Sequence, residues 1–330
     1  MNIINEIYKY SINTPKDVAV VCEGRSYSYS DLFSIVEGLS DILVKKSAKK
    51  HDMIGVLSTR SELSIFLYLA ILNIGAVYIP IDESLPHKRI EKICQDSKIK
   101  LLIGDDNVCN YEGNELYRVI NVHYRSLQSF KDPNKLVYTA ELASNDPSVV
   151  LFTSGSTGIP KGVILPHKCL YVCSHVDADR NAITSKDNIL TVLNFCFAFS
   201  LQYLQPLIKG ATLFIGTDSI RSDFFTLREY IKSNNITIIT MATQMGHVFC
   251  EESVPSCVRL VIVGGSALPP TRIEGHYKLV SIYGCSECLN AAYYIVGDCT
   301  QEYMLGKPND FMDFRIERND SVNDLNSATL

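Results

Sequence analysis

Residues 151–163, LFTSGSTGIPKGV, concentrate groups that could bind phosphate. The apolar run PSVVLFT leads into them and predicts a buried strand. Beyond it, Gly155 and Gly158 let the backbone turn so that successive N–H groups converge on one point. The segment also offers hydroxyl and ammonium donors, on Thr153, Ser154, Ser156, Thr157 and Lys161. Such a set suits phosphate oxygens, although a solvated Gly/Ser turn between a strand and a helix is the alternative.

A P-loop NTPase is a rival interpretation of the same residues. Its G-x-x-x-x-G-K-[ST] motif places the lysine directly after the last glycine and follows it with a hydroxyl that holds magnesium. Here Ile159 and Pro160 follow the last glycine, and Gly162 follows Lys161. The P-loop interpretation therefore fails. The lysine beside a rigid proline favours phosphate binding over a plain turn.

The elements around this loop alternate between helix-like and strand-like segments. Apolar residues recur at helical spacing in residues 28–46, and DMIGVLS then reads as a short buried strand. Residues 61–82 predict a buried helix that stops at Gly75 and turns into a strand ending at Pro80. Further strand-like runs are IKLLIGD, ATLFIGT, ITIITMA, VRLVIVGG and YKLVSIYG. This alternation predicts an α/β fold of largely parallel sheets covered by helices on both faces.

Composition bounds the class of protein. A chain of 330 residues is long enough for a large α/β core split into two subdomains, and the polar residues 184–188 are the predicted seam. Apolar residues make up 46% and charged residues 20%, a balance typical of globular proteins. The net charge of −5 argues against a nucleic-acid partner. No run of eighteen apolar residues and no apolar signal-peptide region is present, so we expect a cytoplasmic protein without a membrane span.

Eleven cysteines are scattered at irregular spacing. Without a secretion signal, this pattern predicts reduced thiols, many of them buried. Cys285 and Cys288 form a C-x-x-C pair, but no second pair follows at zinc-ribbon spacing. We therefore interpret them as core or loop thiols and not as metal ligands.

Four further segments accompany the TSGSTGIPKGV loop. They are YSYSDL at residues 27–32, LNIGAVYIPID at 72–82, GGSAL at 264–268 and YGCSE at 283–287. In this order they resemble the motifs of the adenylate-forming superfamily, which contains acyl-CoA synthetases, luciferases and the adenylation domains of nonribosomal peptide synthetases. The resemblance runs from about residue 10 to 318 and is strongest to the peptide-synthetase domains. An unrelated nucleotidase with a Gly-rich loop would leave YGCSE and GGSAL as coincidences.

The resemblance implies a reaction and roles for particular residues. The family lets a carboxylate attack the α-phosphate of ATP, giving an acyl adenylate and pyrophosphate, so that catalysis is mainly positioning and charge neutralisation. ATP and Mg²⁺ are the implied cofactors, and Glu287 is the implied magnesium ligand. Tyr283 would stack on adenine and Ser286 would bind phosphate. The implied catalytic set is Thr153, Ser154, Ser156, Thr157, Lys161 and Glu287. The implied nucleotide-binding set is Gly155, Gly158, Gly264, Gly265, Ser266, Ile282, Tyr283, Gly284 and Ser286.

Each of these assignments has a plainer alternative when it is taken singly. Glu287 could be a solvated loop carboxylate, Tyr283 a core aromatic residue, and the glycine pair at 264–265 a simple turn. Their joint occurrence in the order of the family favours the functional interpretation.

The acyl pocket departs from the pattern of this family. Residues 194–210 match a segment that carries an F-D motif in domains for α-amino acids, where the aspartate pairs with the substrate ammonium. Ala198 stands at that position, and the nearest aspartates in the sequence are Asp187 and Asp218. Burying an ammonium without a carboxylate costs on the order of several kcal/mol. The implied pocket residues are Ala198, Phe199, Gln202, Thr240, Ile262, Gly264, Ile282, Asn290 and Ala291.

This departure predicts a substrate without a free α-ammonium. Candidates are an aryl, keto, hydroxy or fatty acid, or an amino acid whose amine is bound elsewhere.

The last residues bear on domain content and on the acceptor. GKPNDFMDFRIERND, residues 306–320, resembles the family's G-x-P turn and the strand that follows it. The sequence ends at Leu330, before the family's G-E-L-x-I-x-G motif, its ribose-binding aspartate and its mobile C-terminal domain with the catalytic lysine. Residues 1–330 are thus expected to correspond to the N-terminal core without the small C-terminal β-subdomain or the C-terminal domain.

In the family, the mobile domain recruits coenzyme A or the phosphopantetheine arm of a carrier protein, and the IPID and YSYSDL motifs favour the carrier protein. Two hypotheses follow for the chain: an ATP-dependent acyl-adenylating core, or a non-catalytic nucleotide-binding or scaffolding fragment that keeps the fold.

Overall fold

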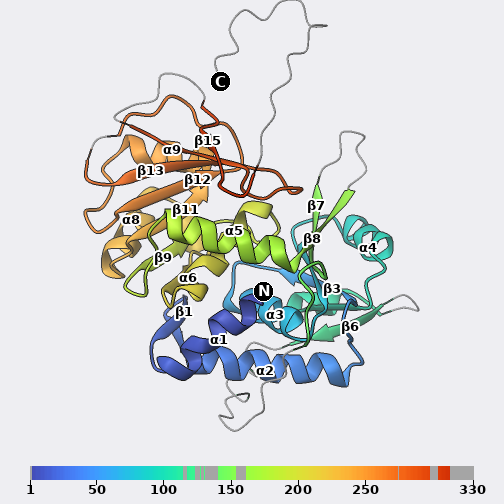
Figure 1. The fold of residues 1–330 in the computed structure, drawn as a ribbon. Coiled ribbons are helices and arrows are strands. Elements are labelled where there is room, and N and C mark those ends of the chain that lie inside the picture. Colours follow the sequence, from blue (N-terminus) through green and yellow to red (C-terminus); the bar gives the residue numbers. More distant parts are fainter. Residues whose placement is uncertain are drawn as a thin grey trace, which may run out of the picture.

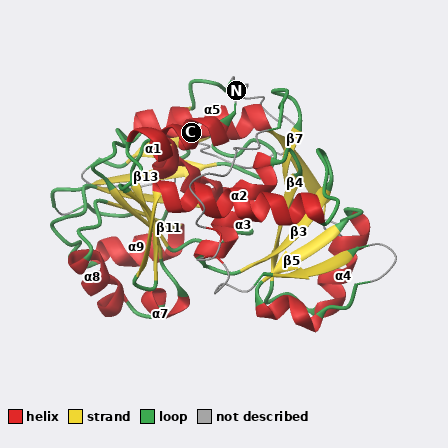
Figure 2. Cartoon of the chain, turned by 90° about the horizontal axis from the view of Figure 1, so that it is seen from below, coloured by secondary structure: helices red, strands yellow, loops and turns green. Residues whose placement is uncertain are grey.

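The computed structural model describes residues 2–113, 117–122, 127, 130, 140–153, 161–273, 275–297 and 304–312. Within them, two sheets stand side by side with helices between and outside them (Figures 1 and 2). This confirms the α/β class with largely parallel sheets that the sequence predicts. No helix in this part of the chain is both long and apolar enough to cross a membrane.

The helices are α1 (Ile3–Asn13), α2 (Tyr29–Lys45), α3 (Glu62–Asn73), α4 (His87–Asp96), α5 (His167–Arg180), α6 (Leu204–Ile208), α7 (Asp218–Arg221), α8 (Phe224–Ser233) and α9 (Thr243–Glu251), with 3₁₀ segments η1 (Asp106–Asn110) and η3 (Ala198–Tyr203). The strands of the larger sheet are β1 (Val18–Cys22), β2 (Arg25–Ser28), β9 (Asn188–Thr191), β10 (Thr212–Ile215), β11 (Ile238–Ala242), β12 (Leu260–Gly264), β13 (Lys278–Tyr283), β14 (Ala292–Ile295) and β15 (Lys307–Pro308). Those of the smaller sheet are β3 (Met53–Ser58), β4 (Val77–Asp82), β5 (Leu101–Gly104), β6 (Arg118–Asn121), β7 (Pro147–Thr153) and β8 (Lys161–Pro166).

The larger sheet has the strand order β15-β14-β13-β12-β11-β9-β10-β1-β2. Its strands from β13 to β1 run parallel, and antiparallel strands close both edges. The smaller sheet has the order β6-β5-β3-β4-β7-β8, in which only β8 is antiparallel to its neighbour. The chain leaves the smaller sheet after β8, and the predicted seam at 184–188 follows α5 and ends at the first residue of β9. That seam stays a prediction.

Helices α2 and α3 form the layer between the sheets (Figure 2). Helix α2 contacts β1 and β2, and α3 contacts β1 as well as β3 and β4. On the outer face of the smaller sheet, Ile90 and Ile93 of α4 pack against the strands. On the outer face of the larger sheet, Leu227 of α8 and Phe249 of α9 do the same. Each sheet is therefore covered on both faces, as continuous apolar strands require.

The YSYSDL segment begins helix α2. Ser28 is the N-cap residue, and its side chain accepts from the backbone N–H of Asp31 while the Asp31 carboxylate accepts from the backbone N–H of Ser28. This reciprocal capping box satisfies two N–H groups that would otherwise lack partners. The buried Tyr29 hydroxyl donates to the Ala211 carbonyl at 2.8 Å. The motif thus fixes the start of α2 and joins it to the segment before β10.

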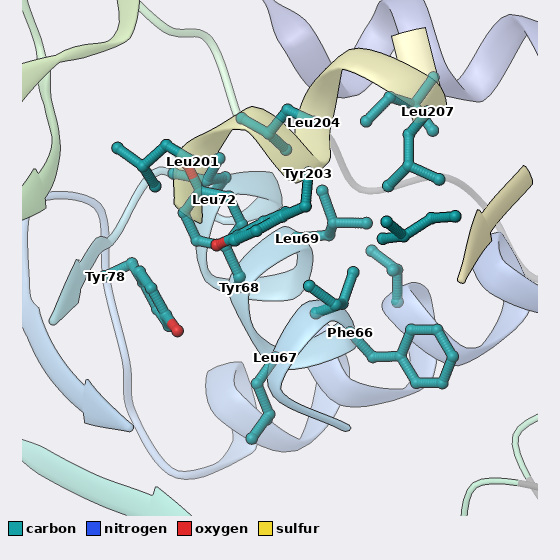
Figure 3. Close-up of a cluster of buried hydrophobic side chains, with 14 of the residues drawn as sticks. Phe66, Leu67, Tyr68, Leu69, Leu72, Tyr78, Leu201, Tyr203, Leu204 and Leu207 are labelled. Atoms are coloured by element: carbon teal, nitrogen blue, oxygen red, sulfur yellow. The ribbon is translucent and has the colours of Figure 1, made fainter. Parts of the chain in front are cut away.

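The core between the sheets is built around α3. Figure 3 shows Tyr68, Leu69 and Leu72 of α3 close to side chains of η3 and α6, including Leu201, Tyr203 and Leu204. The rings of Tyr68 and Tyr203 meet edge to face with centroids 5.6 Å apart. Because η3 carries Tyr203 on its buried side and begins at Ala198, the position of Ala198 is set by packing against α3.

Two details differ from the sequence predictions. Strand β4 continues past Pro80 to Asp82. Pro80 pairs with Val56 of β3 on one side, and on the other side β4 pairs with β7 only at Tyr78. A proline without an N–H is therefore tolerated there. In addition, the glycine-rich loop does not lead from a strand into a helix, because β8 follows it and pairs antiparallel with β7.

His167 at the start of α5 should make stability depend on pH. Its side chain is 2% exposed, and burial lowers its pKa to about 4, while Asp146 opposes the shift and Lys50 and His51 reinforce it. A histidine in the unfolded chain titrates near pH ~6.5. The unfolded state therefore binds a proton first as pH falls, so stability is full above pH ~6.5 and is lost towards pH 4.

We expect the free energy of unfolding to fall by about 2 kcal/mol between pH 7 and pH 5 from this group alone. Urea unfolding of the wild-type protein and of His167→Gln at both pH values measures the difference. The substitution His276→Gln, at an exposed ring, is the matched control. An unchanged pH slope in His167→Gln would contradict the assignment.

Candidate functional site

A cavity of about 490 Å³ opens at the carboxyl ends of four parallel strands. Its walls include residues 192–194 after β9, 242–245 at and after the end of β11, 264–266 at and after the end of β12, and 284–286 after β13. Ligands of open α/β sheets bind outside the carboxyl ends of the strands, where loops diverge. The cavity is therefore placed where this fold class binds small molecules.

Many of the site residues expected from the sequence meet in this wall. They are Ala198, Phe199, Gly264, Gly265, Ser266, Ile282, Gly284, Ser286 and Asn290. Gln202 lies instead in a small recess behind the wall, together with Ala198 and Asn290. Thr240 and Ile262 are buried within β11 and β12, and Ala291 is buried beside β14. None of these three lines the cavity, because it opens beyond the ends of the strands and not along them.

The wall segment around Ala198 is held in shape by two contacts. The Ser200 hydroxyl hydrogen-bonds to the carbonyls of Phe197 at 2.6 Å and Phe195 at 3.1 Å. The ring of Phe199 lies over Gly264, where a Cβ atom would come within 3.0 Å of it. Glycine at 264 therefore lets the ring form one side of the cavity.

Asp82, the last residue of the LNIGAVYIPID segment, ties the smaller sheet to the cavity. Its carboxylate accepts a hydrogen bond of 2.6 Å from the side-chain amide of Asn194, a wall residue that follows β9. Burial opposes ionisation of Asp82, but hydrogen bonds from Ser84 and Asn194 outweigh it and lower its pKa. A charge-assisted bond of this kind positions the wall from the neighbouring sheet.

The YGCSE segment forms a tight turn over residues 284–289. A Cβ atom on Gly284 would lie 1.5 Å from the carbonyl oxygen of Leu289, so only glycine fits. Leu289 itself has a φ of +53°, and the Ala291 N–H donates to the Tyr283 carbonyl at 2.8 Å. The turn places Ser286 on the cavity wall. The Tyr283 ring and the Glu287 carboxylate, which are expected to contact the nucleotide, are both exposed.

The surroundings of Glu287 fit a magnesium ion that is held mainly by a bound nucleotide. Within the described ranges, no group of three or more His, Cys, Asp or Glu side chains is arranged to hold a metal ion. Mg²⁺ in nucleotide sites keeps several waters and takes one or two carboxylates plus substrate phosphates. Glu287, a single exposed carboxylate beside the cavity, is of the kind that such a site uses.

Thr153 and Lys161 stand opposite each other, where β7 ends and β8 begins. The Thr153 hydroxyl lies 3.5 Å from the Lys161 carbonyl oxygen, and the Lys161 side chain is exposed. Neither residue lines the cavity. The loop residues predicted to bind phosphate between them, Ser154, Gly155, Ser156, Thr157 and Gly158, lie outside the described residues.

Two arginines in the wall were not found by sequence reasoning. Arg60 and Arg221 both line the cavity, and their Nη1 atoms lie 2.7 and 3.3 Å from Oδ1 of Asp218. Burial, and then the charge of Arg221, lower the pKa of Arg60. Arg60 follows β3 and Arg221 follows β10, so a search for cations beyond strand ends would have detected them. They supply positive charge at a site expected to hold anions.

A buried carboxylate next to Ala198 was also missed. Asp177 of α5 is 0% exposed and lines the recess behind Ala198. Its Oδ1 lies 2.6 Å from Nη2 of Arg180, and its Oδ2 accepts from the side-chain amide of Asn290. Burial raises the pKa of Asp177, against the opposing effects of Arg180 and the hydrogen-bonding amides. Packing of α5 against η3, which the sequence does not report, brings this acid beside the wall.

Asp187 and Asp218, the aspartates nearest to Ala198 in the part of the sequence that follows α5, form ion pairs with arginines. Asp218 pairs with the two wall arginines, and Asp187 pairs with Arg259 at 2.9 Å. None of the described residues that line the cavity is acidic.

Comparisons with known proteins bear on the family and on the fold. Residues 9–325 match the family model described as AMP-binding enzyme. The chain is 30% identical over 289 residues to surfactin synthase subunit 2 of Bacillus subtilis, covering 86% of this chain and 8% of that protein. It thus spans only a small part of the curated relatives that it matches.

Solved structures show the same fold. The N-terminal subdomain of Klebsiella oxytoca NpsA in complex with 3-hydroxybenzoyl-AMSN superimposes with a TM-score of 0.80 at 23% identity, covering 93% of this chain and 78% of that one. NpsA-ThdA, an artificially fused adenylation–PCP di-domain from the same organism, gives 0.76 at 22% identity, covering 89% and 56%. With a family match across nearly its whole length, this chain belongs to the AMP-binding, or adenylate-forming, enzyme family.

Proposed function

We propose that the chain binds ATP and a carboxylic acid in this cavity and joins them as an acyl adenylate with release of pyrophosphate. The observation that carries the proposal is the meeting of the GGSAL segment, the YGCSE turn and the Ala198 segment around one cavity at the carboxyl ends of β9, β11, β12 and β13. We further propose that residues 1–330 act as the N-terminal adenylation core, divided near 184–188.

In this reaction one carboxylate oxygen bonds to the α-phosphorus as the bond from that phosphorus to the leaving pyrophosphate breaks. Both reactants are anions, so the site must offset their repulsion. Arg60 and Arg221 supply positive charge from the wall, and Ser286 offers a hydroxyl donor. Lys161 and the hydroxyls of residues 153–157 would bind the β- and γ-phosphates. Mg²⁺, held by Glu287 and the phosphates, would neutralise further negative charge.

We propose that the acid lacks a free α-ammonium. Ala198 offers no carboxylate, and the nearby Asp177 is already paired with Arg180. By contrast, Gln202 in the recess is 6% exposed, and neither atom of its amide has a hydrogen-bond partner among the described residues. A buried amide without partners favours a ligand that can hydrogen-bond to it. An aryl, keto or hydroxy acid with a neutral polar substituent therefore fits better than an α-amino acid.

The acceptor of the activated acyl group is a phosphopantetheine thiol of a carrier protein in this proposal, with coenzyme A as the alternative. The fused adenylation–PCP structure of NpsA-ThdA, which shares this fold, supports the carrier protein.

Stable acyl-adenosine sulfamates test the substrate class. We expect calorimetry to show that a hydroxy-acyl or aryl analogue binds at least tenfold more tightly than the matched α-amino analogue, a difference of about 1.4 kcal/mol. Thermal stability should rise with the tighter ligand, because it binds only the native state. Ala198→Asp should shift the preference towards the α-amino analogue by restoring a carboxylate partner. A wild-type preference for the α-amino analogue would overturn the assignment.

Pyrophosphate exchange separates the two classes of function. Exchange that depends on the acid supports the enzyme, whereas tight binding without exchange supports the alternative of a non-catalytic nucleotide-binding fragment. Tyr283→Ala should weaken binding of every adenosine analogue if this exposed ring stacks on the base.

A further inference from the structure

The 284–289 turn holds two thiols face to face. The Sγ atoms of Cys285 and Cys288 lie 3.3 Å apart, and the Cys288 N–H donates to the Cys285 carbonyl at 3.3 Å. A disulfide has an S–S length of about 2.05 Å, so the sulfurs need to close by roughly 1.3 Å. The backbone of the turn already brings the two side chains onto the same side.

The position of this pair ties it to the candidate site. Ser286 and Glu287 stand between the two cysteines, and Cys285 is exposed and lines the cavity. A covalent link across the turn would constrain the two residues within it. The described cysteines Cys22, Cys94, Cys173 and Cys250 are buried instead. Cys285 is therefore both accessible to an oxidant and part of the cavity wall.

We propose that Cys285 and Cys288 form a reversible disulfide, a redox modification site at the cavity, and that this disulfide weakens nucleotide binding. The second part rests on the proposed function, since it requires that nucleotide contact the turn. The first part depends only on the two thiols and their geometry.

A small disulfide such as glutathione disulfide can supply the oxidising equivalents. One protein thiolate attacks it, forming a mixed disulfide and releasing one glutathione thiolate. The second protein thiolate then attacks the protein sulfur of that mixed disulfide, which forms the Cys285–Cys288 bond and releases a second glutathione. Two protein thiols are oxidised, one glutathione disulfide is reduced to two thiols, and the protons of the protein thiols pass to the released glutathione.

The rate of this exchange should be slow at neutral pH. Only the thiolate attacks a disulfide, and an ordinary thiol is mostly protonated there, which delays the reaction without preventing it. Incubation over hours is therefore appropriate.

Peptide mapping tests the bond directly. The full chain is reduced, exposed to glutathione disulfide, alkylated and digested with chymotrypsin, which cuts after Tyr283 and Leu289 and releases both cysteines in residues 284–289. We expect an unalkylated peptide two hydrogen masses lighter than the dithiol, which dithiothreitol reverts. Alkylation at both positions, or separate glutathione adducts only, would overturn the site.

Calorimetry with ATP and Mg²⁺ on the same samples tests the consequence. We expect the oxidised protein to bind ATP at least tenfold more weakly than its reduced form, about 1.4 kcal/mol. Cys288→Ser, whose side chain does not line the cavity, cannot form the bond across the turn; once protein that carries a glutathione adduct is removed, as checked by mass, it should bind ATP equally with and without the oxidant. An equal loss in Cys288→Ser would assign the effect to another thiol and overturn the regulatory part. If reduced protein bound no ATP, the proposed function would fail while the mass measurement still decided the disulfide.

Discussion

Asp177→Ala should lower the free energy of unfolding by about 3–5 kcal/mol, the range seen when one partner of a buried ion pair is removed. The Asp177 side chain is fully buried and that of Arg180 is 11% exposed, so the guanidinium left behind has little access to water. The side-chain amide of Asn290 would also lose its acceptor. Because folded domains are stable by roughly 5–15 kcal/mol, such a loss is a large part of the total.

The neighbouring helix position provides the control. Asp179 on α5 is 68% exposed and pairs with Lys209, so Asp179→Ala should cost less than about 1 kcal/mol. Urea unfolding of both variants measures the difference. Asp177→Leu combined with Arg180→Met should recover part of the loss, because an apolar pair replaces both charges. Similar stabilities for Asp177→Ala and Asp179→Ala would show that the pair does not support the fold.

Gly284→Ala should weaken ATP binding at least a hundredfold, about 2.7 kcal/mol. The added methyl group would lie 1.5 Å from the Leu289 carbonyl oxygen. The methyl carbon is fixed to the backbone and the oxygen is part of it, so neither can rotate away and the turn must open. Ser286 would then leave the cavity wall, and the exposed Glu287 would move with it.

Gly297→Ala is the matched control, because a Cβ atom there has no neighbour within 4 Å and its φ is not in the left-handed region. Calorimetric titration with ATP and Mg²⁺ compares the two variants, and the thermal midpoint of each checks that it is folded. A folded Gly284→Ala protein with wild-type affinity would remove the 284–289 turn from the nucleotide site.

Local patterns predicted much of this fold because they depend on neighbouring residues. The helical spacing of apolar residues in 28–46 corresponds to α2, and the apolar runs correspond to β5, β7, β10, β11, β12 and β13. Strand β8 is a short edge strand in which three of six residues are exposed, and its apolar residues Val163, Ile164 and Leu165 are consecutive, without the alternation that marks a half-buried strand. Its antiparallel pairing with β7 could not be read from the sequence for that reason.

The site divides in a similar way. Ala198 and Phe199 lie in the cavity wall at positions that the family resemblance indicates. Asp177 and Arg60 reach it from α5 and from the end of β3, through contacts that join distant parts of the chain. No local spacing reports such contacts, so their place in the site emerges only from tertiary packing.

The layer formed by α2 and α3 has a consequence for how the protein unfolds. Helix α3 contacts strands of both sheets, and α2 packs on α3 and on β1 and β2 of the larger sheet, so the two sheets share the core around α3. Removing one sheet would expose the helix faces that the other needs. A division of the chain near residues 184–188 thus separates two sheets but not two independent cores. The two halves should unfold together in a single cooperative transition.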